Sequence, residues 1–201
     1  MRASRSRNLV PYRVAAIAGW AIALAVPTAS RAADEPGTKQ CPGDDSGLTL
    51  PAGFCATIFA DGIGHARHLV VAKNGVVYAN TWSGRYFGND VPHAGGFLVA
   101  LKDTRGIGKA DVNERFGGTV QTGGAGGTGI GIYNGWLYAE LNDKILKYPL
   151  KDAVLPGNKS QVVVHGLPLG GDHPMHPFAI DANGDLFIDV ASATNACRKG
   201  S

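Results

Sequence analysis

Three common signals are missing from this sequence. No stretch repeats apolar residues at the period of about 3.6 that an amphipathic helix needs, so we expect little helix. No run after residue 32 approaches the roughly 20 apolar residues that span a membrane. Lys and Arg do not gather with aromatic residues in any patch, so a nucleic acid is not an expected partner.

Acidic residues are absent from the first 32 positions, which carry five arginines. An apolar run at 14–26 follows the arginines, and Ser30-Arg31-Ala32 fits the small-x-small pattern of a cleavage site. We therefore interpret 1–32 as a secretory signal peptide, with an uncleaved membrane anchor as the alternative. The remaining 169 residues carry 14 Lys and Arg against 16 Asp and Glu, a net charge of −2. We expect a periplasmic or secreted protein with no stable membrane insertion after cleavage.

Cysteine is scarce, with only Cys41, Cys55 and Cys197. Export favours disulfides, because the compartments outside the cytoplasm are oxidising. Cys41 and Cys55 bracket a short loop, so we predict that they pair. Cys197 is then either a free thiol or the partner of a cysteine outside this sequence. Residues 33–47 are rich in Pro, Gly and Asp, and we expect them to form a mobile lead-in segment.

Glycine is abundant, with 29 residues, and one pattern repeats. Asn-Gly between two apolar, β-type runs indicates a β-hairpin. It occurs at Asn74, Asn134 and Asn183, which are 60 and 49 residues apart. Further strand-like runs lie at 55–59, 96–101, 112–116, 144–148 and 161–164. About four short strands per period is typical of a β-propeller blade, so we predict an all-β propeller.

The length supplies about three blades, whereas closed propellers have about four to eight. Three blades alone would leave unpaired sheet edges. We therefore expect residues 48–201 to be a partial propeller, the N-terminal half of a longer one, which needs either the missing half or self-association.

A glycine-rich segment, 122–129, contains a GxGxxG pattern. A dinucleotide site needs a helix after these glycines, but a strand-like run follows here. We interpret the segment as a loop whose backbone approaches a channel or ligand, which makes Gly126, Gly127 and Thr128 candidate cofactor contacts. Two other loops, 103–111 and 181–185, resemble calcium loops but lack the carboxylates that calcium needs, so we predict turns.

Two histidines precede the third predicted hairpin. His173 follows Asp172, whose carboxylate could orient the imidazole. His176 could bind a metal together with His173, but a structural zinc site needs four ligands, and we assign no metal site. The alternative for His176 is a structural role at the start of the next strand. Arg67 precedes the first hairpin as Asp172 and His173 precede the third, so we expect all three to face one channel.

These segments resemble the soluble pyrroloquinoline-quinone (PQQ) dependent sugar and aldose dehydrogenases, most closely the bacterial L-sorbosone dehydrogenase-like proteins. The resemblance covers about residues 41–197. The stretches that carry it are 64–68, 80–85, 166–168, 172–173, 178–181 and 184–187.

The resemblance implies a six-bladed β-propeller of the soluble quinoprotein glucose dehydrogenase type with PQQ on the channel axis. It makes His173 the general base for a sugar hydroxyl while hydride passes to the quinone, and Asp172 a contact to cofactor and base. It places the calcium ligands and the cationic clamp on PQQ in later blades, so we expect the 201 residues alone to be inactive. The alternative function is a non-catalytic propeller that serves as a binding or scaffold module.

Overall fold

Antiparallel β-strands make up the framework, and no helix occurs, in the residues that the computed structural model describes: 46–82, 94–118, 127–190 and 192–194. These residues belong to one compact unit, Gln40–Ser201. The strands are β1 (His65–Val71), β2 (Val77–Trp82), β3 (Leu98–Lys102), β4 (Val112–Phe116), β5 (Ile130–Tyr133), β6 (Trp136–Leu141), β7 (Lys144–Pro149), β8 (Gln161–Val164), β9 (Phe178–Ile180) and β10 (Leu186–Ile188).

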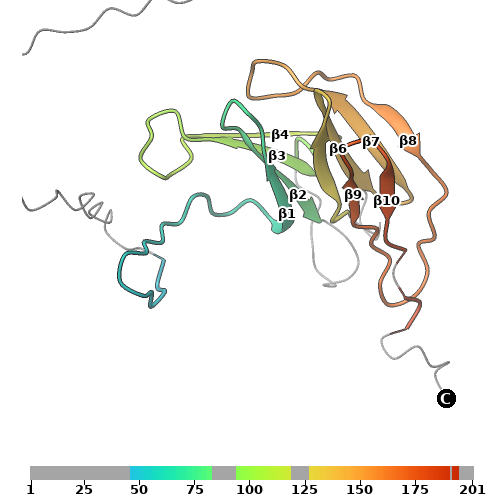
Figure 1. Cartoon of the computed structure of the whole chain (residues 1–201), viewed down its shortest axis with the longest axis horizontal. Coiled ribbons are helices and arrows are strands. Elements are labelled where there is room, and N and C mark those ends of the chain that lie inside the picture. Colours follow the sequence, from blue (N-terminus) through green and yellow to red (C-terminus); the bar gives the residue numbers. More distant parts are fainter. Residues whose placement is uncertain (1–45, 83–93, 119–126, 191, 195–201) are drawn as a thin grey trace, which may run out of the picture. The chain divides into compact units, whose positions relative to one another are not determined.

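Within each sheet, every strand pairs with its neighbour in the chain, which gives two successive four-stranded meanders and a hairpin (Figure 1). The first sheet has the order β1-β2-β3-β4, the second sheet β5-β6-β7-β8, and the third hairpin β9-β10. The prediction of an all-β protein with four strands per repeat is confirmed for the first two repeats. The partial β-propeller of the six-bladed type stays a prediction. In the described part of the chain, no helix is long and apolar enough to span a membrane.

All three predicted Asn-Gly hairpins are present, but the loops that contain Asn-Gly differ in length and in which residues have positive φ. Between β5 and β6, both Asn134 (φ 44°) and Gly135 (φ 79°) have positive φ, as a two-residue type I′ turn requires. The loops before β2 and β10 are longer, and Gly75 (φ 80°) and Gly184 (φ 93°) supply their positive φ. The sequence signal therefore predicts the hairpin but not its loop length.

Both loops that resemble calcium sites are turns, as predicted. The Asp103 carboxylate accepts hydrogen bonds from the backbone N–H groups of residues 105, 106 and 108 at 3.0, 2.8 and 2.7 Å. The Asp181 carboxylate accepts bonds from the N–H groups of Asn183 and Asp185, both at 2.9 Å. The carboxylates hold the turns by taking these backbone donors.

The predicted strand at 55–59 is wrong. This segment has no regular secondary structure, and Ala110 N donates to Phe59 O at 2.8 Å. Phe54 and Ile58 are exposed. Apolar composition made the segment strand-like, but strand formation depends on a neighbour with which to pair.

Several predictions concern residues outside the described ranges. These are the signal peptide 1–32, nearly all of the lead-in segment, Gly126, Cys41 and Cys197. Cys55 is disulfide-bonded. Because Cys41 is not described, the Cys41–Cys55 pairing stays a prediction.

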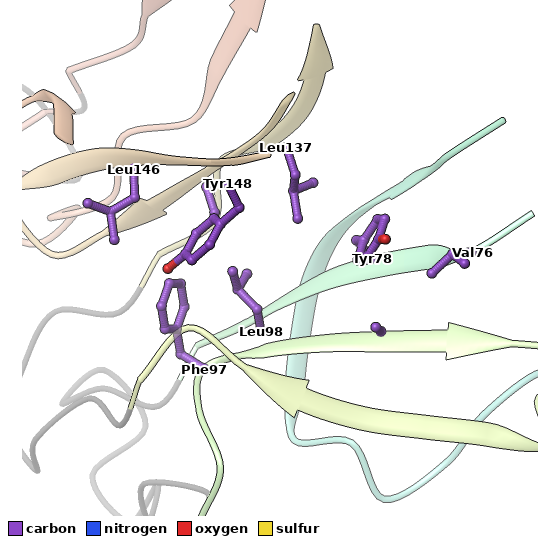
Figure 2. Close-up of a cluster of buried hydrophobic side chains, with 9 residues drawn as sticks. Val76, Tyr78, Phe97, Leu98, Leu137, Leu146 and Tyr148 are labelled. Atoms are coloured by element: carbon purple, nitrogen blue, oxygen red, sulfur yellow. The ribbon is translucent and has the colours of Figure 1, made fainter. Parts of the chain in front are cut away.

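The core lies between the first and second sheets. Figure 2 shows side chains from β2 and β3 pointing toward side chains from β6 and β7. The Tyr78 hydroxyl donates to the backbone oxygen of Val154 at 2.8 Å, which ties β2 to the second sheet. The Phe116 ring meets the Tyr78 and Tyr148 rings edge-on, with centroids 6.0 and 5.7 Å apart. The buried core consists of Val76, Tyr78, Phe97, Leu98, Ala100, Leu137, Ala139, Leu146 and Tyr148.

The third hairpin packs on the opposite side of β5. A Cβ atom added at Gly129 would lie 2.5 Å from a ring atom of Phe178, and one at Gly131 would lie 3.2 Å from it. The two glycines therefore leave the space that the Phe178 ring occupies. Ile130 and Ile132, which alternate with them, pack against the core on the first-sheet side. The three units thus follow one another in chain order, with β5 between β1 and β9.

Candidate functional site

One polar residue occupies the same register position in each of the three hairpins. Asn80, Glu140 and Asp189 each come six residues after the Asn of Asn-Gly. Asn80 is paired with His68 in the ladder. Glu140 N donates to Gly129 O, and Asp189 N donates to Pro177 O, both at 2.9 Å. We call the place that these residues occupy in each hairpin the polar position.

Asn80 links the first sheet to the second. Its side chain is fully buried, and Nδ2 donates to the backbone oxygens of Gly129 and Glu140, each at 3.0 Å. Its Oδ1 has no hydrogen-bond partner among the described residues. The amide thus supplies two bonds across the sheet boundary through its nitrogen.

Glu140 links the second sheet to the loop before the third hairpin. Its carboxylate is fully buried. Oε2 accepts from the backbone N–H groups of Thr128 and Gly129, both at 2.9 Å, and from the Thr128 hydroxyl at 3.3 Å. Oε1 accepts from His176 N at 2.6 Å and lies 3.2 Å from His176 Nδ1. A buried carboxylate needs such donors, and this one draws them from two separate segments.

A cavity of about 170 Å³ lies beside this network. Its lining includes Arg67 from β1, Thr128 from the segment before β5 and His173 from the segment before β9. Thr128 is buried, His173 is half-buried and Arg67 is exposed. The remaining lining residues are His68, Met175, Pro177 and Asp189.

A bulge in β1 positions Arg67. The ladder with β2 pairs Ala66 with Thr81 and His68 with Asn80, so Arg67 is the extra residue of the strand. A β-bulge redirects a side chain relative to the regular alternation. The structure therefore places Arg67, Thr128 and His173 on one cavity, although they lie in three different repeats.

The other predicted site residues lie differently. Asp172 has an exposed side chain, its backbone N–H donates to Ala193 O at 3.1 Å, and it is not part of the cavity lining. Gly127 is buried, and a Cβ atom added there would lie 2.0 Å from the backbone oxygen of Glu140. Gly127 thus lies close to the backbone of β6, and the expected approach of the glycine loop to a channel or ligand stays a prediction. Gly126 is outside the described residues.

Sequence reasoning missed Glu140 and assigned no role to Asp189. The signal was an acidic residue at the end of an apolar strand, at the same distance from Asn-Gly as Asn80. His176 is 1% exposed and bonded to Glu140, in agreement with the structural alternative for this residue. The described residues contain no group of three His, Cys, Asp or Glu side chains that could hold a metal ion.

No protein-family model and no curated protein matches this chain. Among solved structures, it is similar to the calcium structure of Trichoderma reesei Carbohydrate-Active Enzymes Family AA12, with 19% identity over 67% of this chain and a TM-score of 0.48. It is also similar to the iodide structure of the same protein family, with 18% identity over 63% of this chain and a TM-score of 0.44. The chain spans 31% and 29% of the length of these two matched chains.

Proposed function

We propose that this chain contributes about three blades of an exported, PQQ-dependent β-propeller oxidoreductase that oxidises a hydroxyl of a sugar or aldose. The observation that carries the proposal is the cavity that gathers Arg67, Thr128 and His173 from three repeats. The two consecutive four-stranded meanders support the propeller, in which each blade is such a sheet. The sequence motifs around Asp172 and His173 support the choice of family.

The residues at the cavity fit one end of PQQ, a planar quinone with three carboxylates. An arginine guanidinium matches a carboxylate in a bidentate pair, and Arg67 is the cation of the cavity lining. The volume of about 170 Å³ is below the roughly 300 Å³ at which ordinary small-molecule sites begin. We therefore propose that Arg67 holds a carboxylate of PQQ and that further contacts, with the calcium ligands, come from outside the described residues.

We assign the chemical role of each residue from its position at the cavity. PQQ supplies the hydride acceptor when bound. We assign His173 as the general base that takes the proton of the substrate hydroxyl, because imidazole is the common proton acceptor near neutral pH. Thr128 donates its hydroxyl and its N–H to Glu140, which fixes its place on the cavity wall. Glu140 is thus a positioning residue, and Asp172 is a proposed contact beside His173.

Export is part of the proposal. The interpretation of 1–32 as a signal peptide and the disulfide at Cys55 both support an oxidising compartment, the periplasm or the exterior of the cell.

The test measures PQQ binding and turnover separately. We expect the exported protein, loaded with calcium, to bind PQQ and, once its propeller is complete, to reduce a dye with sorbosone or glucose as substrate. His173→Ala should leave PQQ binding unchanged and lower turnover by about a hundredfold or more. His165→Ala, which alters an exposed histidine away from the cavity, is the matched control. Absence of PQQ binding would contradict the proposal and favour the non-catalytic scaffold.

A further inference from the structure

An aromatic ring covers a glycine where the second sheet meets the third hairpin. Tyr133 is the last residue of β5, and Gly184 belongs to the third Asn-Gly loop. A Cβ atom added at Gly184 would lie 2.9 Å from the Tyr133 hydroxyl oxygen and 3.1 Å from its ring. The Tyr133 hydroxyl donates to Ala182 O at 3.4 Å. The ring can approach the backbone so closely because glycine has no Cβ atom.

The equivalent place between the first and second sheets has no such ring. The ladder registers make Ala72 the equivalent of Tyr133, because each comes directly after the strand residue whose partner lies three positions beyond the Asn of Asn-Gly. Gly135 is the glycine of the second Asn-Gly turn, and no atom lies within 4 Å of a Cβ atom added there. Among the described residues, the ring that covers Gly184 therefore has no counterpart over Gly135.

A cleft of about 310 Å³ lies at this place. Ala72, Ile132 and Leu150 supply apolar side chains to its lining, and all three are half-buried and pack against the core. Gly135 also lines the cleft. The volume is at the lower end of the range of roughly 300 to 1,000 Å³ for small-molecule sites, so the cleft has room for a ligand of one ring.

Hydrogen bonds fix the walls of the cleft to one another. Asn74 Nδ2, in the loop between β1 and β2, donates to Ala153 O at 3.4 Å. Leu150 N, which follows β7, donates to Gly135 O at 2.8 Å. The segment after β7 is thus held to the loops of both sheets. The cleft shares no lining residue with the cavity of about 170 Å³ that includes His173.

The cleft carries a net positive charge. Lys73 and Lys151 line it and are exposed, and within the described part of the chain no ion pair to either amino group is found. Asp152 adds one negative charge, so the net charge of the lining is +1. The two amino groups can therefore pair with an anionic ligand without breaking an ion pair within the protein.

We propose that this cleft binds an aromatic carboxylate with a single ring. The ring lies over Gly135, in the way that the Tyr133 ring lies over Gly184. The carboxylate pairs with Lys73 and Lys151. The missing side chain at Ala72 selects a flat ring, and the lysines select its charge. This site does not depend on the proposed oxidoreductase activity.

Titration of the exported chain with phenylacetate, followed by calorimetry, tests the proposal. We expect saturable binding with a dissociation constant of about 1 mM or below, as a ligand of this size can reach. Phenylacetamide lacks the charge and should bind at least about threefold more weakly. Cyclohexylacetate keeps the carboxylate on a thicker ring and should also bind more weakly. No saturable binding, or equal binding of the three compounds, would overturn the proposal.

Two kinds of variant locate the site. Ala72→Tyr supplies a ring from within the chain, so it should abolish phenylacetate binding. Lys73→Gln and Lys151→Gln should each weaken binding by about threefold, whereas Lys159→Gln, at an exposed lysine outside the cleft, should leave it unchanged. Circular dichroism verifies that each variant folds.

The amide resonance of Gly135 should shift on phenylacetate binding, and that of Gly184, which Tyr133 already covers, should not. Undiminished binding in folded Ala72→Tyr, or equal effects of the three lysine variants, would contradict the assigned cleft. These measurements need neither PQQ nor calcium, so a failure here is separate from a failure of the proposed oxidoreductase activity.

Discussion

The backbone N–H of His176 donates to Oε1 of Glu140 at 2.6 Å, and both residues are withdrawn from water, at 1% and 0% exposure. Glu140 lies on β6, and His176 lies in the segment that leads to β9. The bond therefore connects the second sheet to the third hairpin. Because water cannot reach these groups, a lost donor or acceptor here stays unsatisfied in the folded state, which costs more than the loss of a surface bond.

Glu140→Gln should lower the free energy of unfolding by about 2 to 4 kcal/mol. A glutamine keeps the size of the side chain, but its amide nitrogen cannot accept a bond. Either Thr128 N and Gly129 N or His176 N then faces another donor. Urea denaturation measures the change, and hydrogen exchange at His176 N shows whether the third hairpin loosens first.

The matched control is Glu114→Gln on β4, which removes the same charge from an exposed position. We expect a change within about 0.5 kcal/mol there, as at most surface sites. Similar values for the two variants would show that the buried Glu140 network contributes little to stability.

Asn80→Asp should destabilise the fold more than Asn80→Leu, although aspartate is closer to asparagine in shape. The Asn80 nitrogen donates to the oxygens of Gly129 and Glu140, and a carboxylate would face both oxygens as an anion. Leucine loses the two bonds without burying a charge. We expect a difference of about 2 kcal/mol or more between the variants in chemical denaturation. The reverse order would contradict the assigned orientation of the amide.

Gly129→Ala should separate the third hairpin from β5. The added Cβ atom would lie 2.5 Å from the Phe178 ring and 3.0 Å from His176 O, so the hairpin must shift. We expect a loss of about 1 to 3 kcal/mol, as for other overpacked sites. Gly170→Ala is the control, because nothing lies within 4 Å of its Cβ position. The double variant Gly129→Ala/Phe178→Leu replaces the ring by a smaller side chain. It should recover part of the lost unfolding free energy if the clash is the cause.

Local patterns predicted the strands well where each repeat is regular. The ranges 112–116 and 161–164 are β4 and β8, and the Asn-Gly signal predicted all three hairpins. The segment 55–59 failed because its pairing partner, not its composition, decides whether it is a strand. The sequence could not show that Glu140 is buried, because its cover comes from the segment around His176, 36 residues later.

The candidate site was predicted by analogy between repeats. Arg67 lies in β1 of the first hairpin and His173 precedes the third hairpin, and the cavity lining includes both. Their roles toward PQQ stay predictions. The same analogy, extended from the loops to the strands, would have identified Glu140 and Asp189 as equivalents of Asn80. The sequence motifs that predicted the site lie in loops, whereas Glu140 and Asp189 lie at the ends of strands, so the motifs did not identify them.

Alkaline pH should destabilise the fold, and Tyr78 should account for part of the loss. Burial raises the pKa of the Tyr78 hydroxyl above its ordinary value of 10.0, and burial also raises the pKa of Tyr148. As the pH rises past 10.0, the unfolded chain releases these protons before the folded chain does, so the folded state loses stability. Below that pH the contribution is fully present.

Tyr78→Phe should therefore flatten the decline in unfolding free energy as the pH rises past 10.0, and the part of the decline that comes from Tyr148 should remain. At neutral pH the variant should lose about 1 kcal/mol, because the hydroxyl no longer donates to Val154 O. Tyr133→Phe removes a hydroxyl with an exposed bond to Ala182 O at 3.4 Å and serves as the control. If Tyr78→Phe and the wild type lose stability equally as the pH rises, the buried Tyr78 hydroxyl is not the group that responds.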